Sequence, residues 1–95
     1  MYKNKTLTDN DFIDMAMIVD NNFIGNNHIK ISNKPNLVRV YGHTKGGKCC
    51  NCDVKFILKD NFIESILTQN EDAETEVAYR SITNETFTKI KDLYN

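Results

Sequence analysis

The stretch Cys49–Lys59, CCNCDVKFILK, decides the fold of this chain, because its side chains alternate in character along the run. Alternation with a period of two is typical of a strand buried on one side, whereas a helix needs apolar residues three and four apart. We therefore predict a strand here. Its core-facing set is Cys50, Cys52, Val54, Phe56 and Leu58, and its opposite set is Asn51, Asp53, Lys55 and Lys59.

Two segments before this stretch have the same period. His28–Ser32 alternates with Ile29 and Ile31 on one side, and Leu37–Gly42 is rich in β-branched and aromatic residues. Residues 33–36, Asn-Lys-Pro-Asn, carry the signals of a turn between them. The sequence thus predicts a three-stranded antiparallel sheet over residues 28–59. Val38 and Val40 would face its core, with Leu37, Arg39 and Tyr41 on the other face.

The chain after this sheet is less uniform. Residues 62–69 fit either a short helix or a strand, and the alternation of Ile63, Ser65, Leu67 and Gln69 favours the strand. The acidic run at 70–74 is predicted to be a loop, and residues 76–82 are predicted to form another strand.

Helices are predicted at both ends. Thr8 and Asp11 form a capping-box pattern before an apolar stripe, which predicts a helix over about residues 9–20. Thr83 is expected to cap a final helix with the stripe Phe87, Ile90, Leu93 and Tyr94. The fold class is therefore α+β. We expect residues 1–95 to form one domain, with a single antiparallel sheet of three to five strands and both helices packed on one face.

Charge is distributed unevenly along the chain. The net charge of −1 combines −2 over residues 1–29, +6 over residues 30–59 and −5 over residues 60–95. Such asymmetry is typical of a protein with an anion-binding face. Since the basic block coincides with the predicted sheet, we expect a lysine-rich face opposite the helices.

The segment Gly42–Cys49, GHTKGGKC, comes close to the phosphate-binding pattern G-x-x-x-x-G-K-[ST], with cysteine at the hydroxyl position. A phosphate loop must lead into a helix, whose N-terminal amides bind the phosphate. The run after Lys48 instead has the period of a strand, so we predict a β-hairpin loop. Its glycines supply the unusual backbone angles, and His43, Lys45 and Lys48 would contact anionic groups.

The three cysteines allow two interpretations. Cys50 and Cys52 are predicted to be small core residues of the strand. A zinc site using His43, Cys49 and Cys52 is the minor alternative, because a structural zinc needs four ligands and a second C-x-x-C pair is missing. No disulfide framework is expected from an odd number of cysteines.

The sequence has no apolar run long enough to cross a membrane and no secretory signal pattern, so we expect a cytoplasmic protein. We expect no enzymatic activity and no cofactor. The hypothesis is a small binding protein, an inhibitor or adaptor of the kind that phages and mobile elements direct against bacterial immunity, since its composition is rich in asparagine and lysine. It would bind a protein partner or a small anionic, nucleotide-like ligand, and it could form a homo-oligomer. The binding residues would be Arg39, Tyr41, His43, Lys45 and Lys48.

The alternative function is direct DNA or RNA binding through the basic sheet and hairpin of residues 30–59. Stacking of bases on Tyr41 and hydrogen bonding by Arg39 would support it. The sequence alone leaves open the identity of the partner, the oligomeric state and the role of the cysteines.

Overall fold

The computed structural model describes residues 6–21, 23, 29–43, 52–60, 62–69 and 79–93, which form two helices and a five-stranded antiparallel sheet. The elements are α1 (Asp9–Val19), β1 (Ile29–Lys34), β2 (Leu37–Gly42), β3 (Cys52–Lys59), β4 (Phe62–Gln69), β5 (Arg80–Ser81) and α2 (Asn84–Leu93). The α+β class and the strand interpretation of 62–69 are thus confirmed. Lys45, Lys48, Cys49, Cys50 and the predicted loop at 70–74 lie outside the described residues.

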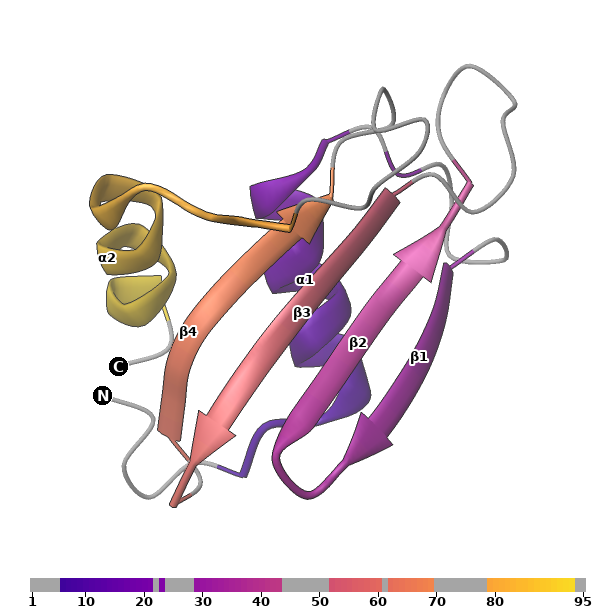
Figure 1. Cartoon of the computed structure of the whole chain (residues 1–95), viewed down its shortest axis with the longest axis horizontal. Coiled ribbons are helices and arrows are strands. Elements are labelled where there is room, and N and C mark those ends of the chain that lie inside the picture. Colours follow the sequence, from indigo (N-terminus) through magenta and orange to yellow (C-terminus); the bar gives the residue numbers. More distant parts are fainter. Residues whose placement is uncertain are drawn as a thin grey trace.

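The strands follow one another across the sheet in chain order, each antiparallel to its neighbour (Figure 1). The pairing of β1 with β2 runs up to Lys34 and Leu37, so the turn is Pro35–Asn36 alone and is shorter than the predicted 33–36. Proline suits this position because its fixed φ and missing N–H do not interrupt a strand there. Asp60, at the end of β3, has a φ of 52°, a left-handed conformation that aspartate tolerates.

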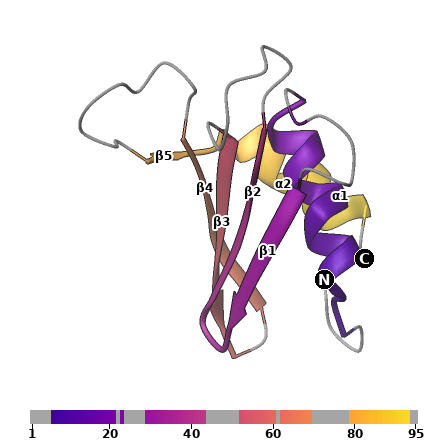
Figure 2. The same cartoon turned by 90° about the vertical axis from the view of Figure 1, so that its right-hand side faces the viewer.

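Both helices pack on the same face of the sheet (Figure 2). The core between the helices and the sheet contains Val38 and Val40 of β2 and Val54 and Phe56 of β3, which are fully buried. The ring of Phe56 meets the ring of Phe12 of α1 edge to face, with their centroids 5.2 Å apart. Full burial of one such side chain stabilises the fold by about 1.5 to 3 kcal/mol, so this alternating set accounts for much of the sheet–helix packing.

Local hydrogen bonds fix where each helix begins. The Thr8 hydroxyl accepts from the Asp11 backbone at 3.3 Å, and the Thr8 backbone donates to the Asp11 carboxylate at 2.9 Å, which confirms the predicted capping box. The Thr83 hydroxyl accepts from the Thr86 backbone at 3.2 Å and caps α2. Neither helix of the described parts is long and apolar enough to cross a membrane.

The C-terminal helix buries less of its predicted stripe than expected. Ile90 is fully buried and Phe87 packs partly against the core, but Leu93 is 61% exposed. Burial stops near Ile90 because α2 packs beside β4, at the border of the sheet (Figure 1). Tyr94 lies outside the described residues.

A β-bulge interrupts the pairing of β3 with β4. Ile57 is opposite Ser65, whereas the next residue, Leu58, is opposite Ile63, so Glu64 is an extra residue in β4. Bulges bend a strand and increase its local twist. The end of β4 that contains Phe62 is therefore irregular.

Replacing Phe56 should test whether the central strand carries the core. We expect Phe56→Ala to lower the free energy of unfolding by about 3 to 5 kcal/mol, measured by urea unfolding, because it leaves a cavity against Phe12. The matched control is Phe62→Ala, whose side chain is 41% exposed. It should cost less than about 1 kcal/mol. Equal losses for the two variants would contradict this packing.

Candidate functional site

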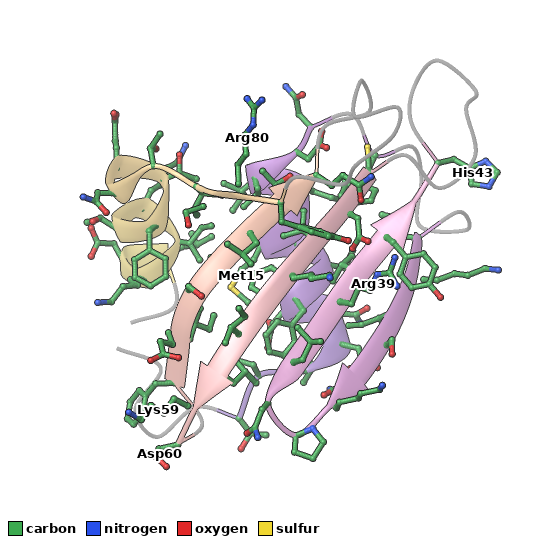
Figure 3. The ribbon with its side chains drawn as sticks, viewed as in Figure 1. Met15, Arg39, His43, Lys59, Asp60 and Arg80 are labelled. Atoms are coloured by element: carbon green, nitrogen blue, oxygen red, sulfur yellow. The ribbon has the colours of Figure 1, made fainter. Side chains whose placement is uncertain are left out.

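The candidate site is the face of the sheet opposite the helices, toward which Figures 1 and 3 look. Successive side chains of a strand point to opposite faces, so the strand register gives its members. We call it the open face. Its side chains are Lys30, Ser32 and Lys34 of β1, Leu37, Arg39 and Tyr41 of β2, Asp53, Lys55 and Ile57 of β3, and Ser65, Leu67 and Gln69 of β4.

A buried carboxylate lies on this face. Asp53 is only 2% exposed. One of its oxygens, Oδ2, accepts from Arg39 Nε at 2.7 Å and from the Tyr79 hydroxyl at 2.6 Å, and it lies 2.6 Å from Arg39 Nη2. The other oxygen, Oδ1, is buried and has no hydrogen-bond partner among the residues that the structure describes. Arg39 itself remains 47% exposed and can contact other molecules.

The strand register explains how these three residues meet. Arg39 is opposite Lys55, and Tyr41 is opposite Asp53, so Arg39 and Asp53 are diagonal neighbours within reach of a long side chain. Tyr79 directly precedes β5, where Arg80 is opposite Thr68 of β4. It therefore reaches across β4 toward Asp53. The carboxylate is covered from both sides by side chains far apart in sequence.

Two aromatic rings extend this group. The Arg39 guanidinium lies 4.8 Å from the centroid of the Tyr41 ring, and the Lys55 ammonium lies 3.8 Å from that of the Tyr79 ring. Such cation–π contacts are attractive at these distances. We call Arg39, Tyr41, Asp53, Lys55 and Tyr79 the central cluster. These contacts join its members into one continuous group on the open face.

The cluster changes the titration of two of its members. Burial, followed by the hydrogen bond to Asp53, raises the pKa of Tyr79 to about 12 from 10.0. The hydrogen bond to Asp53 raises the pKa of Arg39 above its ordinary value, against the opposing effect of burial. Both shifts favour a protonated tyrosine and a charged arginine around the carboxylate.

The predicted binding residues are only partly brought together. Arg39 and Tyr41 lie in contact on the open face, as their shared strand parity indicated. His43 lies just after β2, at the outer side of the sheet and apart from Arg39 (Figure 3). Lys45 and Lys48 lie outside the described residues.

Two cluster members were missed by reasoning from the sequence. Strand parity placed Asp53 on the face opposite the core, and its burial there was not predicted. Tyr79 lies in a segment where only Arg80 and Ser81 are described as strand. The available signal was that Asp53 is the single acid in the basic block 30–59. An isolated acid among cations often has one of them as a partner.

The structure bears on both interpretations of the cysteines. Cys52 is fully buried and belongs to the hydrophobic core, which confirms the core prediction for this residue. Within the described ranges no group of three His, Cys, Asp or Glu side chains could hold a metal ion. Cys49, the other thiol of the zinc alternative, lies outside them.

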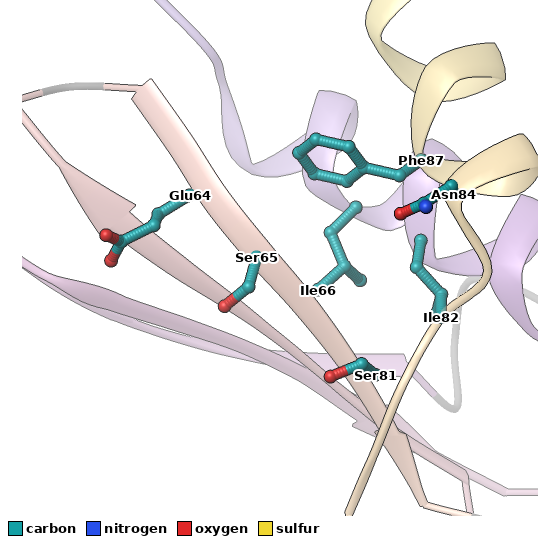
Figure 4. Close-up of a pocket in the computed structure, with 7 residues that line it drawn as sticks. All are labelled: Glu64, Ser65, Ile66, Ser81, Ile82, Asn84 and Phe87. Carbon is teal, nitrogen blue, oxygen red and sulfur yellow. The ribbon is translucent and has the colours of Figure 1, made fainter.

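A small cavity opens where β5 leaves the sheet. It has a volume of about 250 Å³. Figure 4 shows its walls, which are Glu64, Ser65 and Ile66 of β4, Ser81 of β5, Ile82 after it, and Asn84 and Phe87 of α2. Sites for small molecules usually measure about 300 to 1,000 Å³. The cavity is large enough for one side chain, so the open face remains the larger candidate surface.

Titration of Tyr79 should report the cluster directly. A tyrosine whose pKa is about 12 in the fold and 10.0 when unfolded stabilises the fold fully below pH 10. That contribution is lost as the pH rises from 10 to 12, because the unfolded state ionises first. We expect Tyr79→Phe to remove this part of the pH dependence of unfolding. In difference absorbance against that variant, the phenol should ionise near pH 12; ionisation near 10 would contradict the cluster.

Arg39 and Asp53 should behave as a coupled pair. Arg39→Leu leaves a buried carboxylate without its cation and should cost about 2 to 3 kcal/mol of unfolding free energy. The double variant Arg39→Leu with Asp53→Leu should cost less than this, because no buried charge remains. Urea unfolding of the two single variants and the double variant completes the cycle. A double variant that loses the sum of the single losses would show that the pair is not coupled.

The open face carries groups that can bind other molecules. It offers ammonium and guanidinium donors, which pair with carboxylates and phosphates, and aromatic rings that pack against apolar groups. Comparison of the chain with protein-family models, with curated proteins and with solved structures finds no match in any of the three.

Proposed function

We propose that this chain is a small non-enzymatic binding protein, an inhibitor or adaptor that binds an acidic surface of a protein partner with its open face. The observation that carries the proposal is the composition of that face. Among the described side chains of the open face, cations accompany a half-buried apolar centre, and the carboxylate of Asp53 is buried in the central cluster.

The charge of the open face supports an acidic partner. Lys30 and Lys34 are exposed on β1, and Arg39 and Lys55 follow on the neighbouring strands. The chain as a whole has a net charge of −1, so the positive charge is concentrated locally. Complementary charge accelerates association and excludes like-charged proteins.

The apolar part of the face supports a macromolecular partner over a small ion. Leu37 of β2 and Ile57 of β3 are opposite each other, and Leu67 of β4 is a diagonal neighbour of Ile57. All three are half buried, so part of each side chain still meets solvent. Interfaces between proteins commonly combine an apolar centre with a polar rim.

The central cluster supports affinity through rigidity. Two nitrogens of Arg39 are bound to Asp53, and arginine has five N–H donors, so others remain for a carboxylate of the partner. Because the guanidinium is already fixed against Asp53 and Tyr41, little side-chain entropy would be lost on binding.

DNA or RNA binding through the same face is the second candidate. The cation–aromatic pairs Arg39–Tyr41 and Lys55–Tyr79 favour it, since bases stack on such groups. The protein's own cations already occupy one side of each ring, which leaves less ring surface for a base. The second candidate predicts binding to single-stranded oligonucleotides that weakens steeply with salt.

The source and location of the protein belong to the proposal too. The asparagine- and lysine-rich composition is the support for a phage or mobile-element inhibitor of bacterial immunity. Such an inhibitor would act in the cytoplasm. Pairing of the basic face with an acidic part of a second copy would give the proposed homo-oligomer.

Charge reversal should test the proposed function. Tagged protein is isolated from the cells that make it, and bound molecules are identified by native mass spectrometry. Lys30→Glu with Lys34→Glu should reduce recovery of the partner about tenfold or more, because two attractive charges become repulsive. The matched control is Lys89→Glu with Lys91→Glu, which changes two lysines of α2, outside the open-face set, by the same charge.

The outcomes separate the candidates. Loss of a protein partner with the first pair and retention with the control would support the proposal. Recovery of nucleic acid instead of protein would favour the second candidate. Purification that yields no bound molecule, or equal loss with both pairs, would contradict both.

A further inference from the structure

The two edge strands of the sheet differ in how their outer backbone groups are protected. β1 forms one border, and no described strand pairs with its outer side (Figure 1). On the other side, β5 pairs with Leu67 and Thr68 of β4, and Ile82 donates to the Ile66 carbonyl at 3.1 Å. The rest of β4 contains the bulge at Glu64, which disfavours strand addition. Within the described ranges, β1 is therefore the regular edge that no other strand covers.

We propose that the outer edge of β1 binds an extended segment of an acidic protein partner as an added strand. This inference rests on the proposed function and specifies how the partner binds. Alternate residues of an edge strand direct their backbone N–H and C=O groups away from the sheet. β1 pairs with β2 over all its residues from Ile29 to Lys34, so its backbone is held extended and ready for a second neighbour. Addition of a strand to such an edge is a common mode of peptide recognition.

The side chains of β1 define the sequence pattern of the added strand. Lys30 and Lys34 stand on the open face, and Ile29 and Ile31 stand on the helix face, where Ile31 is half buried. Residues directly opposite in adjacent strands interact, and opposite charges or apolar pairs are favourable there. The matching segment therefore carries acidic residues alternating with apolar residues.

On the helix face of β1, the apolar side chains end at Asn33. Its side-chain amide donates to the Asp9 carboxylate of α1 at 3.3 Å, on the helix face. An apolar residue of the added strand opposite this polar pair would gain little. The apolar contacts of the segment are thus expected mainly at Ile31, since Ile29 is already buried in the core.

A second copy of this chain fits the edge less well. Antiparallel pairing of two β1 strands about Ser32 would place Lys30 of each copy opposite Lys34 of the other, and like charges in that position are destabilising. Pairing about Ile31 avoids these direct contacts but keeps four lysines on one face of the joined sheet. Edge lysines of this kind discourage self-association. The same charges favour an acidic strand.

The experiment uses a capped peptide, Glu-Val-Glu-Val-Glu-Val, and two versions of it with methyl groups on every Val nitrogen or on every Glu nitrogen. Binding to the full chain is followed by NMR of backbone amides and by hydrogen exchange. The plain peptide should shift the amides of Ile29–Lys34 and slow their exchange. One methylated version should bind about tenfold more weakly or worse, because it lacks the N–H donors that face β1. A Lys-Val peptide should not bind.

The possible failures are distinct. Equal binding by both methylated versions would overturn strand addition but leave charge-dependent binding to the open face intact. Failure of the peptide to bind, while the captured partner still depends on Lys30 and Lys34, would also overturn the inference alone. A dimer in native mass spectrometry that the peptide cannot displace would assign the edge to a second copy and overturn it. Failure of both peptide binding and partner capture would remove the proposed function as well.

Discussion

The rest of the sheet depends on the position of β3 (Cys52–Lys59), which is paired along both of its sides. A central strand must satisfy two environments at once, because its alternate side chains point to opposite faces. One set, with Val54 and Phe56, packs against the helices, and the other set carries the polar groups of the open face. A shift of one residue would exchange the two sets, so the register of β3 fixes the core and the candidate site together.

The burial of Asp53 shows that a polar side chain on the open face of β3 can carry a large desolvation cost. A charged group without water must be paired and hydrogen-bonded, or its desolvation destabilises the fold. Here one oxygen has three polar atoms within 2.7 Å, whereas the other has no hydrogen-bond partner in the described part of the chain. Replacement of a buried ion pair by well-packed apolar residues often leaves the stability unchanged or raises it. The arrangement holds the Arg39 guanidinium against both Asp53 and the Tyr41 ring on the open face.

Most of the fold could be predicted from local patterns. The alternation in β2 and β3 and the capping box at Thr8 gave the correct strands and helix start, because these depend on neighbouring residues. The central cluster could be predicted only in part. Arg39 and Tyr41 share a strand face, but Tyr79 approaches Asp53 only because β5 pairs with β4. Its position depends on the tertiary arrangement of a segment 26 residues from Asp53, and no local pattern encodes that contact.

The lysines of β1 have two physical effects, repulsion of unsuitable strands and attraction of acidic ones, and both favour an acidic partner. An unpaired edge exposes backbone groups that any extended chain could bind, so a protein with such an edge risks indiscriminate association. Lys30 and Lys34 oppose association with a second copy or with basic and purely apolar strands. They do not oppose an acidic strand, which they attract. Specificity requires discrimination against wrong partners as well as attraction to the right one. The lysines on the regular edge of β1, next to the central cluster, would therefore both repel unsuitable strands and attract an acidic one.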